Sequence, residues 1–396
     1  MALDSTNSSE ANQQSPISSN VQKRLLIAVV GFVGLLVLVI FVSQAQLFGW
    51  DFRNNLWGPA HLLSTGRSPY LIDQLFDNSN SIWLPQIVGA GLPLGFLPQV
   101  MATNLWFAIN ILAYGALAYL AMPKKRPAPI WLGISILLLA IFPSFIGHLA
   151  LGQISIIIAA LSIFASQLIL SPKKLWFAAL LITLAAAKPQ LLLLVLPGIM
   201  IAIFRQYGWQ AVIKFAVYGI LWTALLTLPL WIGYPNWVEG FVIALGRNKQ
   251  WAHPSTLQIL RNVLGMAIGT ITWGIFAATL MGILMKMWWD RPTAKSNVIW
   301  SLALTALVTP YVWTWDFVLV VPLIIWTIFA SKTIWSRIIM ALGTGISVIG
   351  MIAMRVSGIN GDMFYWWIPW VIVISAVVAW QINKHVNVPS DLVDTV

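Results

Sequence analysis

The first candidate for chemistry in this sequence is a group of charged residues behind its first long apolar run. Asp51 and Arg53 stand just after the run Leu25–Leu47, and Arg67 follows in the turn Gly66–Tyr70. Only 8% of the 396 residues are charged, and a charge held beside hydrocarbon is costly, so it is a functional candidate by default. A carboxylate can accept a proton, and a guanidinium group can hold a phosphate. A plainer reading is that Asp51 ends a helix and pairs with Arg53, which at an exposed place contributes at most about 1 kcal/mol.

The composition places these residues in a polytopic membrane protein. The chain is 59% hydrophobic, its mean hydropathy is +0.85 and its formal net charge is +11, values that exclude an ordinary soluble domain. It has no cysteine, which excludes disulfides and thiolate metal sites. The basic excess suits loop charges that orient membrane helices better than a nucleic-acid partner, since no soluble region offers a basic face.

The two ends of the chain differ from the rest. Residues 1–22 are rich in Ser, Asn and Gln, which is typical of a disordered tail. Two basic residues then precede the run Leu25–Leu47, which is long enough to span a bilayer and too long for a signal-peptide core. We therefore expect a cytoplasmic tail at 1–22, a membrane domain at 23–384 that begins with a retained helix, and a short cytoplasmic tail at 385–396.

The spacing of the basic residues predicts the topology. Clusters of Lys and Arg recur along the chain, and most apolar stretches between them are long enough for two crossings. Under the positive-inside rule both ends of such a stretch are cytoplasmic, so we expect about twelve helices and cytoplasmic termini. The midpoints should then be turns on the outer face. These expected outer turns are Gly147–Gln153, Lys188-Pro189, Tyr234–Ser255, Pro310–Asp316 and Arg355–Asp362.

Two regions depart from simple spans. Residues 51–101 form the longest outer segment, and prolines interrupt its apolar second half, so we expect short interfacial helices there. The stretch Leu175–Phe204 is broken at Lys188 and Pro189, which leaves two apolar runs that are short for a hydrocarbon core of about 30 Å. We therefore expect Lys188 to lie below the outer surface, facing protein or a water-filled cavity.

Several short motifs stand in order between about residue 50 and residue 325. They are Asp51-Phe52, Gly66-x-x-Pro69-Tyr70, Leu105-Trp106, Leu151-Gly152-Gln153, Ala185–Gln190, Ser255-x-Leu257 with Arg261, and Thr309-Pro310-Tyr311 leading to Trp315-Asp316. This ordered series resembles glycosyltransferase family 87, a family of polytopic GT-C enzymes. Many members have Ser-Trp-x-His where this chain has Trp-Thr-Trp-Asp at 313–316, so a role of that histidine does not transfer to Asp316.

The resemblance implies both an activity and a base. It implies a GT-C-like membrane protein that transfers a sugar from a polyprenyl-phosphate donor to a lipid or glycan acceptor on the outer face of the cell membrane. It also implies an aspartate base in the first outer loop, which here is Asp51. By analogy within the GT-C group, the sugar is mannose or another hexose or pentose.

A donor of this class needs three features at the outer surface of the membrane. An apolar groove takes the tail, cations hold the phosphate, and a base accepts the proton of the attacking hydroxyl. Because phosphate leaves as a stable anion, one carboxylate can suffice where glycosidases use two, and direct attack inverts the anomeric carbon. Besides Asp51, the candidate contacts with donor or acceptor are Arg53, Arg67, Tyr70, Gln153, Lys188, Arg247, Lys249, His253, Arg261 and Asp316.

Most of these contacts have a structural alternative. The loop cations can form a solvated face or extend to lipid headgroups, Gln153 can satisfy a helix end, and Asp316 can cap a helix. Lys188 is harder to explain in this way, because a buried ammonium group needs a partner.

We expect neither a metal nor another cofactor, since no run such as Asp-x-Asp or Glu-x-x-His occurs. Most of the 23 Trp residues are expected in the interfacial belts of a membrane protein, with Trp50, Trp57 and Trp251 as the ones worth testing for sugar contact. We expect a monomer whose partners are membrane lipids, the lipid-linked donor and the acceptor.

The alternative function is a transporter or flippase of a lipid-linked or anionic substrate. Such proteins often have internal repeats and broken helices around a site in mid-membrane. Lys188 beside a helix break favours this reading. Against it, the sequence shows no convincing repeat, and its charges are expected at one rim of the membrane. Formation of a glycosidic product distinguishes the two functions.

Overall fold

The part of the chain that the structure describes is built from helices. The residues described by this computed structural model are 49–71, 75, 81–123, 139, 141–247 and 253–385. They contain no strand, which confirms the all-α prediction for this part and is what a bilayer requires, because backbone groups in hydrocarbon must be satisfied within their own helix. The expected tail at 1–22, the first helix at 25–47 and nearly all of the tail at 385–396 lie outside the described residues.

The first described segment is a series of short helices, as the proline pattern predicts. Helix α2 (Trp50–Phe52), the π-helical turn η1 (Arg53–Trp57) and α3 (Gly58–Ser64) follow one another without a break. Helices α4 (Pro85–Ala90) and α5 (Leu92–Gly95) come next, each with a proline in its first turn. A proline is tolerated there because the N–H that it lacks is not needed. The place of these helices at the membrane interface stays a prediction.

Among the described residues, five helical segments are long and apolar enough to cross a membrane. They are α6 (Gln99–Ala121), α12 (Trp209–Gly233), α15 (Met266–Asp290), α18 (Ile334–Val356), and Asp362–Lys384, which combines the turn η6 (Asp362–Tyr365) with α19 (Trp367–His385). Helices α8 (Pro143–Leu151) and α9 (Ser155–Leu168) make a sixth if they count as one span bent by 105°. These helices suit a polytopic membrane protein, and the number of about twelve stays a prediction.

The remaining helices are shorter. They are α10 (Leu175–Ala185), α11 (Val195–Tyr207), α13 (Trp237–Arg247), α14 (Thr256–Leu264), α16 (Lys295–Val308) and α17 (Val321–Ala330), with the short turns η3 (Pro172–Lys174), η4 (Pro189–Leu192) and η5 (Thr314–Val320). The break between α10 and α11 confirms the interruption predicted at Lys188. The bend after α8 lies at Gly152, at the end of the turn expected at Gly147–Gln153, because α8 continues to Leu151.

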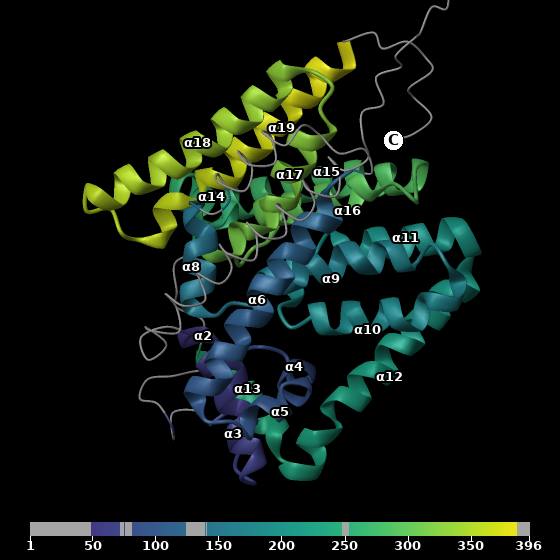
Figure 1. The fold of residues 1–396 in the computed structure, drawn as a ribbon, viewed down its shortest axis with the longest axis vertical. Helices are drawn as coiled ribbons and strands as arrows, with labels where there is room; N and C mark the ends of the chain where they lie inside the picture. Colours follow the sequence, from purple (N-terminus) through teal and green to yellow (C-terminus); the bar gives the residue numbers. More distant parts are fainter. Residues whose placement is uncertain are drawn as a thin grey trace, which may run out of the picture. The chain divides into compact units, whose positions relative to one another are not determined.

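The interior is formed by α16, η5 and α17. Every residue of Ser301–Val308 and of Asp316–Ile325 is buried, and α16 is packed by α9, α11, α15, α17 and α19. Figure 1 shows α18 and α19 side by side, next to α17. By contrast, α12 and α15 expose rows of large apolar side chains, which suits contact with lipid. Asp316 therefore stands at the edge of the most enclosed part of the described chain.

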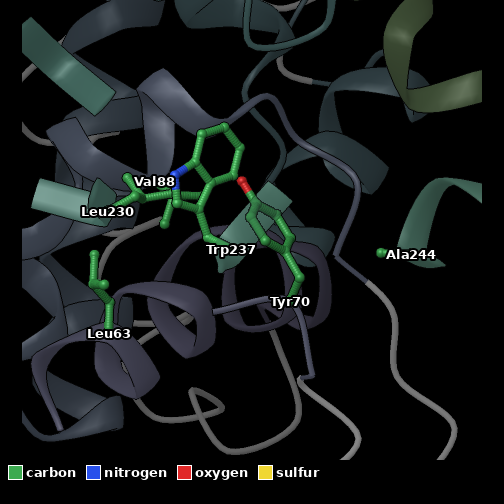
Figure 2. Packing of buried hydrophobic residues seen from close by; sticks show 6 residues of the cluster. All are labelled: Leu63, Tyr70, Val88, Leu230, Trp237 and Ala244. Atoms are coloured by element: carbon green, nitrogen blue, oxygen red, sulfur yellow. The ribbon is translucent and has the colours of Figure 1, made fainter. Parts of the chain in front are cut away.

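A cluster of buried side chains joins the short first helices to α12 and α13. Its members are Leu63, Tyr70, Val88, Leu230, Trp237 and Ala244 (Figure 2). Beside it, α4 crosses α12 so closely that a Cβ added at Gly89 would overlap the carbonyl oxygen of Leu226. The backbone oxygen of a helix cannot move aside easily, so this crossing requires glycine.

The close crossing predicts a loss of stability for Gly89→Ala. Overfilling a packed contact typically costs about 1–3 kcal/mol, so the midpoint of thermal unfolding in detergent should fall. The matched control is Gly282→Ala in α15, where an added Cβ meets nothing within 4 Å and alanine is the better helix former. An unchanged midpoint for Gly89→Ala would show that α4 does not pack on α12 in this way.

Candidate active site

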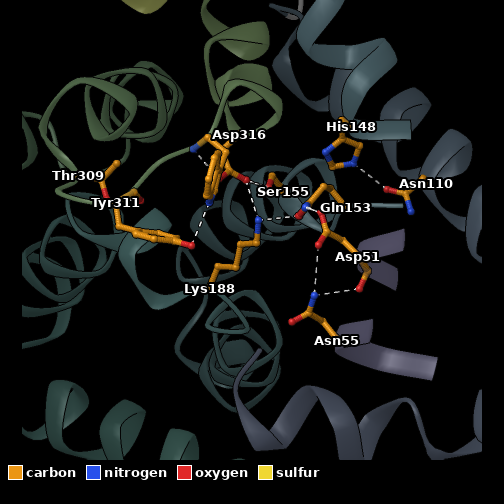
Figure 3. Close-up of polar contacts among 11 residues, drawn as sticks. Asp51, Asn55, Asn110, His148, Gln153, Ser155, Lys188, Thr309, Tyr311 and Asp316 are labelled. Atoms are coloured by element: carbon orange, nitrogen blue, oxygen red, sulfur yellow. Dashed lines mark hydrogen bonds and ion pairs between the residues drawn. The ribbon is translucent and has the colours of Figure 1, made fainter. Parts of the chain in front are cut away.

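Four segments that are far apart in the sequence bring polar side chains together. Asp51 comes from α2, Gln153 from the bend between α8 and α9, Lys188 from the break after α10, and Asp316 from η5. Figure 3 shows these four side chains joined by a line of polar contacts. We call Asp51, Gln153, Lys188 and Asp316 the polar network. Two of its members, Gln153 and Lys188, lie at turns where the sequence predicts breaks in the helices.

The contacts within the polar network are direct. The Lys188 Nζ donates to Gln153 Oε1 at 2.6 Å and to Asp316 Oδ1 at 2.9 Å. The Gln153 Nε2 in turn donates to Asp51 Oδ2. One ammonium group and one amide therefore connect two carboxylates, Asp51 at one end and Asp316 at the other.

The Asp316 end of the network is fully enclosed. Asp316 is 0% exposed and Lys188 only 7%, so each charge depends on the other. The Ser155 Oγ donates to Asp316 Oδ1 at 2.5 Å, and the backbone N–H of Trp313 donates to Asp316 Oδ2 at 3.2 Å. With both oxygens satisfied, this is the geometry that lets a buried ion pair persist.

The Asp51 end is partly open. Asn55 Nδ2 donates to the Asp51 backbone oxygen at 3.0 Å and lies 3.4 Å from Asp51 Oδ1, while Asn55 Oδ1 accepts the backbone N–H of Ile82 at 2.9 Å. Burial raises the pKa of Asp51 to about 6; the charge of Lys188 opposes this rise, that of Asp316 adds to it, and the bond from Gln153 opposes it. The Asp51 carboxylate is thus a stronger base than an exposed one.

The backbone that carries Asp51 and Gln153 is tightly packed. Gly152 has a left-handed φ of +68°, and a Cβ there would lie 2.8 Å from Phe52 Cβ. The Trp106 indole stacks on the Phe52 ring at 5.1 Å and donates from Nε1 to the Gly152 oxygen at 2.7 Å. Three motifs singled out in the sequence, those at Asp51, Trp106 and Gly152, therefore form one packing unit.

A group of aromatic rings adjoins the Asp316 end. His253 lies 4.2 Å from Tyr311 and 5.3 Å from Trp313 between ring centres. Trp313 stacks on Trp315 at 5.0 Å and donates from Nε1 to the Tyr311 hydroxyl at 3.0 Å. His253 and the motif at 309–316 thus meet; both were predicted from the sequence to contribute to one site.

The other residues predicted from the sequence lie in several surroundings. Arg53 is partly buried, with its guanidinium 4.4 Å from the centre of the Trp50 ring. The Arg261 Nε donates to Thr270 Oγ1 at 3.0 Å. Tyr70 is buried and packs against Phe241 at 4.9 Å between ring centres. Of the remaining predicted cations, Arg67 and Arg247 are exposed and Lys249 lies outside the described residues.

Asn55 and Ser155 were not predicted from the sequence, and neither was the contact between His148 Nε2 and Asn110 Oδ1 at 3.0 Å. A signal existed for Asn55, which follows Asp51 by four residues and so shares its helix face. Ser155 and the pair of His148 with Asn110 had no such signal, because their partners come from other helices. In the part of the chain that the structure describes, no three His, Asp or Glu side chains are grouped as metal ligands.

Comparison with known proteins assigns the chain to a family. The model of glycosyltransferase family 87 matches residues 85–313, more than half of the chain. This range includes Gln153 and Lys188, whereas Asp316 lies three residues after it and Asp51 lies 34 residues before it. No curated protein and no solved structure matches the chain. The protein is therefore a membrane-embedded sugar transferase. It belongs to glycosyltransferase family 87.

The close packing at Gly152 predicts a loss of sugar transfer for Gly152→Ala. A left-handed φ costs an alanine about 1–2 kcal/mol, and the added Cβ would push Phe52 and hence Asp51 out of place. A displacement of about 1 Å can slow catalysis on the order of 100-fold. Transfer rates in reconstituted membranes test this, with Gly147→Ala as the control because its Cβ meets nothing within 4 Å. Equal rates for Gly152→Ala and wild type would contradict the packing argument.

Proposed function

We propose that this glycosyltransferase moves a sugar from a polyprenyl-phosphate donor to a hydroxyl group of a lipid or glycan on the outer face of the cell membrane. The observation that carries the proposal is the Asp51 carboxylate, held by Gln153 and Asn55 and partly open. Such an arrangement suits a general base. The remaining expectations belong to the same proposal: a GT-C fold of about twelve helices, cytoplasmic termini, a monomer, and a hexose or pentose donor, of which mannose is the first to test.

The reaction is a single displacement. Asp51 accepts the proton of the acceptor hydroxyl while that oxygen forms a bond to the anomeric carbon of the donor sugar. The bond between this carbon and the phosphate oxygen breaks, and polyprenyl phosphate leaves with the electron pair. Because the leaving group is already a stable anion, no second carboxylate is needed to protonate it, in contrast to most glycosidases. Attack from the opposite side inverts the anomeric configuration.

Cations of the first outer loop and of the later loops are the proposed ligands of the donor phosphate. Arg53 is nearest to Asp51 in the chain and lies partly buried in η1. Arg67, Arg247, Lys249 and Arg261 are the further candidates. Preorganised cations stabilise the negative charge that develops on a leaving phosphate. Asp51 can accept a proton but cannot stabilise this charge, so we assign that role to these cations.

An apolar hollow in the described part of the chain suits the donor tail. It lies between α3, α5 and α12 and is lined by residues that include Leu63, Leu92, Phe96, Leu225 and Ile232. From Asp51 to Leu63 the chain is helical, which corresponds to at most about 18 Å, since an α-helix rises 1.5 Å per residue and the π-helical turn η1 rises less. A polyprenyl chain is long enough to cover that distance, so the phosphate can lie at α2 while the tail lies against α12.

The proposal predicts that Asp51→Asn and Asp51→Ala lose transfer. General-base catalysis contributes about 100-fold or more, so product formation in reconstituted membranes supplied with polyprenyl-phosphate sugars should fall by at least that factor. Thermal unfolding should be unchanged, and Asp290→Asn, at an exposed site on α15, should retain full activity. Wild-type rates in both Asp51 variants would remove Asp51 from the mechanism. Movement of the donor across the bilayer without a glycosidic product would favour a transporter.

The raised pKa of Asp51 predicts the pH dependence. The base must be ionised, and its pKa is about 6, so kcat/KM for the acceptor should be constant above this value and fall as the pH drops through it. The donor is a phosphodiester and remains ionised over this range. An exposed aspartate would turn the profile near pH 4. A midpoint near 4, measured between pH 4 and 8, would contradict the partly buried position of Asp51 in the structure.

A further inference from the structure

We propose that Lys188 and Asp316 form a positioning pair that orients the base Asp51 through the Gln153 side chain, and that Lys188 does not contact the donor phosphate. This inference rests on the proposed function, because it takes Asp51 as the base. It departs from the sequence-based expectation that Lys188 holds phosphate. The arrangement that supports it is the direct line from Asp316 through Lys188 and Gln153 to Asp51 (Figure 3).

The direction of the Gln153 amide follows from its two neighbours. An ammonium group can only donate and an ionised carboxylate can only accept. The amide oxygen must therefore face Lys188, at 2.6 Å, and the amide nitrogen must face Asp51. If Lys188 were absent, the amide could turn over and present its oxygen to the carboxylate, which would repel it. Lys188 thus fixes which end of Gln153 meets the base.

This direction also distinguishes the two oxygens of Asp51. Oδ2 accepts the Gln153 N–H, whereas Oδ1 has Asn55 Nδ2 at the longer distance of 3.4 Å. The less strongly bound oxygen is the more basic one and the one free to approach a hydroxyl group. We therefore assign proton acceptance to Oδ1, with Gln153 holding the carboxylate plane through Oδ2.

Asp316 explains why Lys188 can serve in this way. The Lys188 ammonium is almost fully buried and has a carboxylate at 2.9 Å, so its charge is already balanced. A donor phosphate at the same place would set two anions against one cation. Asp316 is itself fixed by Ser155 and by the Trp313 backbone, so the pair is a rigid support and not a mobile ligand.

The two charges act on Asp51 in opposite directions. The positive charge of Lys188 favours the ionised carboxylate and the negative charge of Asp316 disfavours it. Among the described residues, the other charged or titratable groups beside the polar network are Arg53 on η1, His148 on α8 and Asp362, which accepts from Thr314 Oγ1 at 2.9 Å. None of them is replaced in the variants below. Because Lys188 also acts on His148, and Asp316 on Asp362, the shift of the pH profile is interpreted together with kcat and donor KM.

The test compares Lys188→Met, Asp316→Asn and Gln153→Met with wild type for kcat, for donor KM and for the midpoint of the pH profile. We expect kcat to fall on the order of 10- to 100-fold in each, with donor KM changed by less than about twofold. The midpoint should move to higher pH in Lys188→Met and Gln153→Met, and to lower pH in Asp316→Asn. The control Lys286→Met, at an exposed site on α15, should match wild type.

A double variant guards against misfolding, because removing one partner of a buried ion pair can cost about 3–5 kcal/mol. Lys188→Met with Asp316→Asn leaves no unpaired charge, and we expect it to unfold near the wild-type temperature with reduced kcat and unchanged donor KM. A large rise in donor KM with an unmoved pH midpoint would overturn the inference and make Lys188 a phosphate ligand. If Asp51→Asn keeps full activity, the proposed function fails instead, whatever the other variants do.

Discussion

The buried ion pair of Lys188 and Asp316 is the interaction on which the rest of the site depends. An ammonium group enclosed by protein needs an anion, and Asp316, fully buried at the start of η5, supplies it at 2.9 Å. The pair joins the break after α10 to the enclosed core of α16, η5 and α17. Since a buried charge without its partner is strongly unfavourable, this contact fixes the two segments against each other. Lys188 then holds Gln153, and Gln153 holds Asp51, through their hydrogen bonds.

Tight backbone packing extends this fixed arrangement to the short helices α2 and α3 at the start of the described chain. The left-handed turn at Gly152 and the Trp106 indole hold the bend between α8 and α9 against Phe52. Asp51 precedes Phe52 directly and so has little freedom. The π-helical turn η1 then begins at Arg53, and such turns are frequent at functional sites. Asp51, the proposed base, is thus held by its neighbours in the chain as well as by the polar network.

The structure gives a physical role to Asp316, the residue at which this chain differs from the motif expected for the family. Where the resemblance led us to look for a histidine, Asp316 stands, and it pairs with the lysine of the Ala185–Gln190 motif. A histidine in that position would be neutral or positive beside Lys188, whereas an aspartate balances it. The aspartate therefore leaves the pair without net charge, and the aromatic rings of Tyr311, Trp313 and His253 lie beside it.

The sequence by itself determined the membrane class, the helical fold, the short proline-started helices before α6, the break at Lys188 and the family. These features follow from local properties of the chain, namely the length of its apolar runs, the positions of its prolines and the order of its motifs. Tertiary structure decided what the polar residues do together. Sequence spacing predicted that Lys188 lies below the outer surface, but it could not choose between phosphate and Asp316, 128 residues away, as its partner. Sequence spacing also could not identify Ser155 as a partner of Asp316. A hydrogen bond between two helices depends on how the helices pack and produces no periodic pattern in the sequence.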